Sequence, residues 1–273
     1  MSMPTRLLRD LLPDVGPYEM RGDPAVEVTF VTHDSRRVRP GSVFSCVPGS
    51  SYDGHDFAAE AVGAGAAALL VAHFVDLPGA AVPQVRVGDP RATMGMLAAA
   101  LHGHPSRAMR VLGVTGTNGK TTTTYLIESV ANAAGLATGV IGTVEIMVRE
   151  AVLPAERTTP ESTDLQDLLA GMRDEGVELV AMEVSSHALS LHRVDGTRFA
   201  AACFTNLSRE HLDFHGAMEH YLEAKLGLFD PDRSAAAAVN LDDEVSSAVV
   251  RRAESGGLEV MTTDVAAFGE ALR

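Results

Sequence analysis

The sequence has few cysteines and no long hydrophobic run. Cys46 and Cys203 are the only cysteines among 273 residues, and they lie far apart in the sequence. This excludes a disulfide framework and disfavours a cysteine-based zinc site. No stretch approaches the roughly 18 apolar residues needed to cross a membrane, and the first residues lack the apolar core of a secretory signal. We therefore expect a cytoplasmic protein without a membrane partner.

Positive charge is also scarce. Lysine and arginine number 22 against 36 aspartate and glutamate residues, a net charge of −14. A protein that coats DNA or RNA needs the opposite balance, so we expect no nucleic-acid partner. With 46% apolar and 21% charged residues, the chain has the composition of a globular protein, and its length corresponds to one or two domains at roughly 150 residues each.

Short apolar segments alternate with segments of helical periodicity along the chain. Strands are predicted at 26–31, 41–47, 67–71, 84–87, 111–115, 179–184, 200–204, 236–240 and 258–262. Helices are predicted at 55–62, 91–101, 126–134, 165–176, 217–228 and 242–253. This alternation favours an α/β fold with a parallel sheet covered on both faces. A stop near 105–109 divides the predicted domains, 1–106 and 107–273.

The segment after the predicted strand 111–115 is the most informative motif. It reads Gly116-Thr117-Asn118-Gly119-Lys120-Thr121. Glycines let backbone N–H groups turn toward phosphates, the lysine meets the β- and γ-phosphates, and the threonine hydroxyl reaches Mg²⁺. Val114 stands where the strict P-loop pattern has glycine, so the segment is a P-loop variant. A glycine-rich strand–helix turn with a chance lysine is the alternative.

Three further residues are weak candidates when taken singly. Glu183 ends a predicted strand, where ligands gather in open α/β sheets, but an acid there can also simply be solvated. His211 lies in a loop, where histidines are more often packing residues than ligands. Lys225 lies in a predicted helix. Their order after the phosphate loop gives them more weight.

Together these segments resemble the Mur ligases, most closely the MurE type. The resemblance covers nearly the whole chain, and its specific segments are 113–122, 158–161, 182–189, 204–213 and 221–225, with 34–36 and 53–57 similar to the uridine-nucleotide domain. It implies an N-terminal UDP-substrate-binding domain and a P-loop central domain. It also implies an ATP-dependent ligase that adds the third amino acid, meso-diaminopimelate or L-lysine, to UDP-N-acetylmuramoyl-L-alanyl-D-glutamate through an acyl phosphate.

The resemblance assigns roles around ATP and Mg²⁺. The nucleotide-binding positions are Gly116, Thr117, Asn118, Gly119, Lys120, Thr121 and Thr122. One Mg²⁺ would be held by Thr121 and Glu183, and a second by His211 with Glu183. Lys225 matches the position at which family members carry a carbamate, whose oxygens suit Mg²⁺. Lys120, Glu183, His211 and Lys225 are thus the expected catalytic set.

The substrate positions follow in the same way. Ser35 would contact the uridine-bearing end, and the sugar–peptide part would be held by Thr158, Thr159, Ser185 and Arg193. The sequence departs from the family pattern at Arg157, where asparagine is common, and at Leu191, where glutamine is common. Glu210 precedes the histidine where aspartate is usual. The first two departures bear on substrate contacts.

MurE-type ligases are longer than this sequence and carry a C-terminal domain that binds the amino acid. We find no counterpart here and expect an incomplete central domain, so ligation should need a partner such as a separate C-terminal half. The alternative is a non-catalytic or decayed module that binds nucleotide or UDP-muramoyl peptide. A folyl-glutamate ligase is a third option, disfavoured by the uridine-domain motifs and by Ser185-Ser186-His187.

Overall fold

The computed structural model describes residues 4–49, 52–79 and 81–264, which form two compact units. The first comprises Met1–Pro105, Glu161–Leu168 and Leu191–Thr197, and the second Ser106–Pro160, Leu169–Ser190 and Arg198–Arg273. The chain thus passes from one unit to the other after Pro105. The two later segments of the first unit lie within the predicted second domain, a division that a single boundary did not anticipate.

The first unit is built on a five-stranded sheet in the order β2-β7-β6-β5-β4, parallel except for β2. A separate antiparallel pair joins β1 and β3. The elements are β1 Arg6–Leu7, α1 Leu8–Leu11, β2 Glu19–Arg21, β3 Glu27–Val28, β4 Phe30–Thr32, β5 Ser42–Ser45, α2 Ala58–Gly63, β6 Ala66–Val71, β7 Gln84–Arg86 and α3 Pro90–Leu101. Short 3-10 helices lie at Leu12–Asp14, Ser35–Arg37, Gly54–Phe57 and Pro105–Arg107. The predicted strand 26–31 is therefore two short strands that join different sheets.

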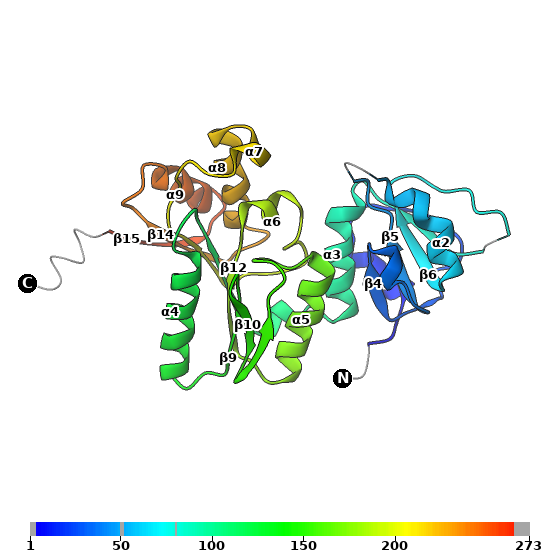
Figure 1. The fold of residues 1–273 in the computed structure, drawn as a ribbon, viewed down its shortest axis with the longest axis horizontal. Coiled ribbons are helices and arrows are strands. Elements are labelled where there is room, and N and C mark those ends of the chain that lie inside the picture. Colours follow the sequence, from blue (N-terminus) through cyan, green and yellow to red (C-terminus); the bar gives the residue numbers. More distant parts are fainter. Residues whose placement is uncertain (1–3, 50–51, 80, 265–273) are drawn as a thin grey trace, which may run out of the picture. The chain divides into compact units, whose positions relative to one another are not determined.

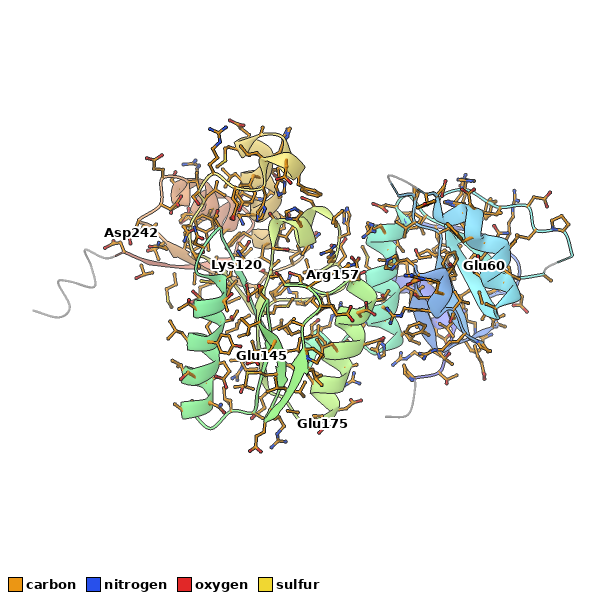
Figure 2. All side chains as sticks on the ribbon, viewed as in Figure 1. Glu60, Lys120, Glu145, Arg157, Glu175 and Asp242 are labelled. Atoms are coloured by element: carbon orange, nitrogen blue, oxygen red, sulfur yellow. The ribbon has the colours of Figure 1, made fainter. Side chains whose placement is uncertain are left out.

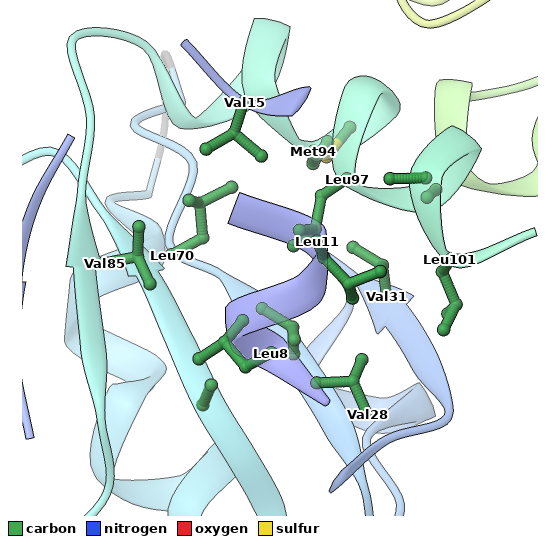
Figure 3. Close-up of a cluster of buried hydrophobic side chains, with 14 of the residues drawn as sticks. Leu8, Leu11, Val15, Val28, Val31, Leu70, Val85, Met94, Leu97 and Leu101 are labelled. Carbon is green, nitrogen blue, oxygen red and sulfur yellow. The ribbon is translucent and has the colours of Figure 1, made fainter. Parts of the chain in front are cut away.

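Two hydrophobic clusters lie on the two faces of this sheet. Successive side chains of a strand point to opposite faces, and β6 follows this rule, because Leu70 joins one cluster and Leu69 the other. The first cluster also takes in Leu8 and Leu11 of α1 and Leu97 of α3 (Figure 3). The sheet of the first unit is thus buried on both faces, as its continuous apolar strands require.

The second unit carries an eight-stranded sheet in the order β11-β10-β9-β12-β8-β13-β14-β15. Its elements are β8 Arg110–Thr115, α4 Lys120–Ala133, β9 Thr138–Ile141, β10 Glu145–Val148, β11 Ala151–Pro154, β12 Leu179–Glu183, α6 Ser186–Ser190, β13 Ala201–Phe204, α7 Leu212–His215, α8 Met218–Leu226, β14 Ala236–Asn240, α9 Ser246–Ser255 and β15 Glu259–Thr263, with a 3-10 turn at Gly227–Phe229. The helix α5, Ser162–Asp174, contributes residues to both units. The helices α4 and α5 lie on opposite sides of the strands around β12 (Figure 1).

The parallel strands β12, β8, β13, β14 and β15 confirm the predicted parallel sheet. The structure adds a parallel strand, β9, and an antiparallel hairpin, neither of which was predicted. The strands β10 and β11 pair antiparallel with each other, and β10 pairs antiparallel with β9. This hairpin was not predicted because β11 is exposed and β10 only half-buried, so neither presents a buried apolar run. The parallel strands end at one edge, which gathers the segments that follow β8, β9, β12 and β13.

The helix α4 was predicted from an apolar spacing that does not mark its buried face. Leu126 and Val130 are 61% and 71% exposed, whereas Thr124 and Ala131 are buried. Small side chains form the inner face of this helix because it packs directly on β8, β9 and β12. In the ranges that the structure describes, no helix is both long and apolar enough to span a bilayer.

Candidate functional site

The loop between β8 and α4 has the backbone of a phosphate cradle. Gly119 has φ +86° and immediately precedes α4, and Gly116 has φ +152°. A Cβ on Gly116 would lie 1.8 Å from Oγ1 of Thr205. Only glycine combines this positive φ with the absence of a Cβ, so position 116 requires glycine. The loop therefore delivers the N-terminus of α4, with its unpaired N–H groups, to the edge of the sheet.

The segment after β13 holds this loop in place. The backbone N–H of Thr117 donates to the carbonyl of Asn206 at 2.9 Å, and that of Asn118 donates to Asn206 Oδ1 at 2.9 Å. In return, the carbonyl of Asn118 accepts bonds from Oγ1 of Thr205 at 2.7 Å and from Nδ2 of Asn206 at 3.0 Å. Thr205 and Asn206 lie in the segment 204–213 that carries the family resemblance, but they were not predicted as site residues.

Lys120 begins α4 at this edge (Figure 2). Its Nζ donates to the carbonyls of Gly116 and Thr117, both at 2.9 Å. Burial lowers the pKa of Lys120, and the nearby carboxylates of Glu183 and Glu210 oppose that shift. The ammonium group thus lies over the loop and can exchange its carbonyl partners for phosphate oxygens. Thr122, one position past Thr121, is exposed.

Glu183 presents a buried carboxylate at the end of β12, only 1% exposed. Its Oε1 accepts bonds from the Thr121 hydroxyl at 2.9 Å and from the backbone N–H of Thr143 at 2.8 Å. Its Oε2 accepts the Thr143 hydroxyl at 3.1 Å. A Cβ on Gly142 would come within 2.5 Å of Oε1, so a side chain at position 142 would displace the Glu183 carboxylate. Thr143, just after β9, was missed because an isolated Gly-Thr pair is too weak a signal.

The predicted substrate positions Thr158, Thr159 and Ser185 lie around Glu183. The hydroxyl of Thr159 donates to the backbone carbonyl of Glu183 at 3.0 Å and accepts the N–H of Ser185 at 3.2 Å. The hydroxyl of Thr158 lies 3.0 Å from that of Thr143. The structure therefore gathers these three residues and the first turn of α4 around Glu183.

Lys225 lies on α8, and its side chain is buried, 1% exposed, against the ring of Tyr221. Its Nζ lies 4.5 Å from the centroid of the Tyr221 ring. Burial, reinforced by the charge of Lys120, lowers the pKa of Lys225 to about 7, with Glu210 opposing. A lysine with such a pKa is largely neutral at mildly alkaline pH, which leaves its amine available as a nucleophile.

His211 precedes α7 in a left-handed conformation, with φ 54°. A non-glycine residue in this region stores strain of order 1–3 kcal/mol and is commonest where function requires it. The His211 ring lies 4.8 Å from the His187 ring and 6.1 Å from the Tyr221 ring, and its Nε2 is 3.7 Å from a Glu210 oxygen. The backbone thus places the His211 imidazole close to the ring of Tyr221, which packs against Lys225.

The donor set fits Mg²⁺ better than a transition metal. Among the residues that the structure describes, no group of three or more His, Cys, Asp or Glu could hold a metal ion. The Thr121 hydroxyl and the Glu183 carboxylate instead place oxygen donors side by side. Mg²⁺ usually takes one or two protein carboxylates and completes its shell with phosphates and waters. This part of the site therefore fits Mg²⁺ that arrives with a nucleotide.

Two predicted substrate residues belong to the first unit. Ser35 begins a 3-10 turn whose Asp34 side chain accepts the N–H of Arg36 at 3.0 Å. Arg193 forms an ion pair with the buried Glu161, from Nε to Oε1 at 2.9 Å. Arg157, one of the departures from the family pattern, is exposed between β11 and α5 (Figure 2).

Comparisons with known proteins point to one family. Residues 114–272 match the Mur ligase middle domain, and residues 27–102 match the model described as Mur ligase family, catalytic domain. The chain is 51% identical over 233 residues to the UDP-N-acetylmuramoyl-L-alanyl-D-glutamate–2,6-diaminopimelate ligase of Streptomyces coelicolor, covering 85% of this chain and 46% of that protein. It is 49% identical over 227 residues to the enzyme of the same name from Geobacillus kaustophilus, covering 81% and 46%.

A solved structure agrees with these sequence matches. A UDP-N-acetylmuramoyl-L-alanyl-D-glutamate–2,6-diaminopimelate ligase superposes with a TM-score of 0.82 at 27% identity, covering 96% of this chain and 53% of that one. The chain spans about half the length of the curated relatives it matches.

Proposed function

Because the chain belongs to the Mur ligase family, we propose that it provides the nucleotide site and the UDP-substrate site of an ATP-dependent ligase. The proposed substrate is UDP-N-acetylmuramoyl-L-alanyl-D-glutamate. The names of the relatives favour 2,6-diaminopimelate over L-lysine as the amino acid added. One observation carries this proposal: the phosphate loop, the Thr121–Glu183 pair and the loop-facing end of α8 meet at one edge of the sheet.

The proposed reaction joins two anions, so charge control is its main requirement. An oxygen of the substrate carboxylate attacks the γ-phosphorus, and ADP leaves. The incoming amine then attacks the acyl carbon and expels phosphate. In the first step Lys120 would move its ammonium group from the loop carbonyls to the β- and γ-phosphates, and the backbone N–H groups of 119–121 would hold the same oxygens. The N–H groups of Thr117 and Asn118 already donate to Asn206.

Mg²⁺, when bound, would neutralise phosphate charge and orient the triphosphate. Thr121 and Glu183 would hold one ion, and His211 with Glu183 a second. Lys225 would contribute as a carbamate: its neutral amine attacks CO₂, an N–C bond forms, one C=O π pair moves to oxygen and an N–H proton leaves to solvent. The pKa of about 7 that burial gives Lys225 supports this step, because the ammonium form cannot attack.

Thr158, Thr159, Ser185 and Arg193 are proposed to hold the sugar–peptide part of the substrate, with Arg193 as the partner of an anionic group. Ser35 is proposed to contact the uridine-bearing end of the substrate. Hydroxyl and guanidinium donors suit these acceptor groups. At Arg157 and Leu191 the side chains differ from the family pattern, so their contacts with substrate are not part of the proposal.

The decisive test is amino-acid-dependent ADP release by the purified chain. ATP, Mg²⁺ and UDP-N-acetylmuramoyl-L-alanyl-D-glutamate are supplied, with meso-diaminopimelate and L-lysine tried separately, and Lys120→Ala is the control. Release that depends on one amino acid identifies a complete ligase. Binding of ATP and UDP-substrate without release identifies a binding part that needs a C-terminal partner. Binding of neither ligand by a folded chain contradicts the proposal.

The carbamate is tested separately. With ¹³C-labelled bicarbonate, wild-type protein should show a protein-bound carbamate signal by ¹³C NMR, and Lys225→Met should not. A wild-type spectrum without that signal would exclude the carbamate while leaving the nucleotide site in place.

A further inference from the structure

Tyr221 is a large, fully buried side chain that carries a polar group, and none of the roles above uses it. It lies on α8 one turn before Lys225 and is 1% exposed. Its hydroxyl lies 3.1 Å from Oγ1 of Thr117, in the phosphate loop 104 residues earlier. A buried phenol needs a hydrogen-bond partner, and the partner here belongs to the element that would receive the nucleotide.

The hydrogen bonds of Thr117 indicate which group donates. A threonine hydroxyl can donate one bond and accept two. Oγ1 of Thr117 accepts the backbone N–H of Ser208 at 2.9 Å and can donate to the carbonyl of Ser208 at 3.3 Å. With the Tyr221 hydroxyl as the second donor to Thr117, every site on the hydroxyl of Thr117 is filled. Thr117 is itself buried, 7% exposed, so a lost bond there is not simply replaced by bulk water.

The same side chain also packs on Lys225 and on His215. Its ring centroid is 4.5 Å from Lys225 Nζ and 4.9 Å from the His215 ring. A phenylalanine at position 221 would keep both ring contacts. The hydroxyl is therefore not needed to fill the core, and the only partner of the hydroxyl in the described structure is the phosphate loop.

We propose that Tyr221 is a positioning residue for the nucleotide: its hydroxyl, acting through Thr117, fixes the phosphate loop in the geometry that receives the β- and γ-phosphates. This inference rests on the proposed nucleotide site. Because the hydroxyl of Tyr221 bonds to the loop, its contribution to binding should depend on how many phosphates the ligand carries. A residue with a merely structural role would change thermal stability without making that distinction.

The test compares nucleotide affinities of the full chain by isothermal titration calorimetry with Mg²⁺, using AMP-PNP, ADP and AMP. Tyr221→Phe should lower the affinities for AMP-PNP and ADP by about 2- to 10-fold, the range expected for one net hydrogen bond. The affinity for AMP should stay within about twofold of wild type. Tyr18→Phe is the control. It removes a tyrosine hydroxyl from the first unit, where this side chain is exposed, and should leave all three affinities unchanged.

Substitutions of Thr117 complete the cycle. Thr117→Ser keeps the hydroxyl and should bind AMP-PNP like wild type, whereas Thr117→Val should lower the affinity for AMP-PNP. The double variant Thr117→Val/Tyr221→Phe should have the same affinity as Thr117→Val alone. Additive losses, an equal loss for AMP, or wild-type affinity in Tyr221→Phe would overturn the inference. Failure of the wild-type chain to bind AMP-PNP would instead overturn the proposed nucleotide site, and this inference with it.

Discussion

The hydroxyl of Thr121 donates a 2.9 Å hydrogen bond to Oε1 of Glu183, joining the first turn of α4 to the end of β12. The two residues are 62 positions apart, and β12 pairs directly with the strand that leads into the phosphate loop. Sheet register therefore brings a hydroxyl and a carboxylate to one point.

Lys120→Ala should weaken ATP binding at least tenfold, because each charge-assisted hydrogen bond contributes about 1.5–3 kcal/mol. In the described structure the ammonium group of Lys120 donates to loop carbonyls, so the fold should survive its removal. Calorimetric titration gives the affinity and far-UV circular dichroism gives the fold. A folded Lys120→Ala variant with wild-type affinity would refute the assignment of the phosphate loop.

Thr143→Val should raise the Mg²⁺ concentration that supports half-maximal nucleotide binding. The substitution removes the 3.1 Å bond to Oε2 of Glu183 but keeps the backbone N–H to Oε1. The carboxylate should then turn more freely, at a cost of about 1 kcal/mol, or several-fold in Mg²⁺ dependence. Thr143→Ser, which keeps the hydroxyl, is the control. Equal behaviour of the two variants would show that Thr143 does not orient Glu183.

Gly116→Ala should destabilise the second unit and abolish nucleotide binding. Its φ of +152° and the 1.8 Å approach to Thr205 forbid a Cβ, so we expect a loss of about 2 kcal/mol or more in the free energy of unfolding. Gly227→Ala serves for comparison, because its φ is −58° and a Cβ there would meet open space. Urea denaturation should show little change for Gly227→Ala. Similar losses for both would mean that the loop tolerates a side chain.

Lys225→Met should flatten the dependence of stability on pH. In CO₂-free buffer the folded chain holds the pKa of Lys225 near 7, whereas an unfolded lysine has a pKa of about 10.4. Between these values the unfolded chain binds the extra proton, so the contribution of Lys225 to stability should rise with pH by up to about 1.4 kcal/mol per unit. That contribution is fully present above pH 10 and lost as pH falls to 7.

Lys225→Met should also be more stable than wild type at pH 7, because it buries no amine. Urea denaturation at several pH values, with the difference between the two proteins plotted against pH, checks both statements. A constant difference from pH 7 to 10 would show that the amine of Lys225 is solvated in the folded protein.

The residues at the strand ends could be predicted from the sequence because parallel strands end at the same edge of a sheet. Once the segment 111–115 and the segment 179–184 are neighbouring parallel strands, the loop after one and Glu183 at the end of the other must lie at the same edge. Local patterns identify such strands because they are buried on both faces and therefore apolar throughout. The predicted α/β class and most predicted elements depended on this and were confirmed.

The partners of these residues could not be predicted in the same way. Thr143 follows a strand of four residues and has no distinctive neighbours in sequence. Thr205 and Asn206 support the loop through contacts across about 90 residues, which no local pattern encodes. The exposed Leu126 shows the converse limit: periodicity revealed α4, but packing against the sheet chose smaller side chains for its inner face.

The strand order also determines when, during synthesis of the chain, the nucleotide site can form. β8 and its loop are synthesised before both neighbours of β8 in the sheet, β12 and β13, whose first residues are Leu179 and Ala201. The phosphate loop therefore lacks its partners Thr205 and Asn206 until synthesis has reached position 206. Pairing between strands that are this far apart in sequence also forms slowly. The nascent protein should gain its nucleotide site only after these strands leave the ribosome, so binding comes late in the life of the folding chain.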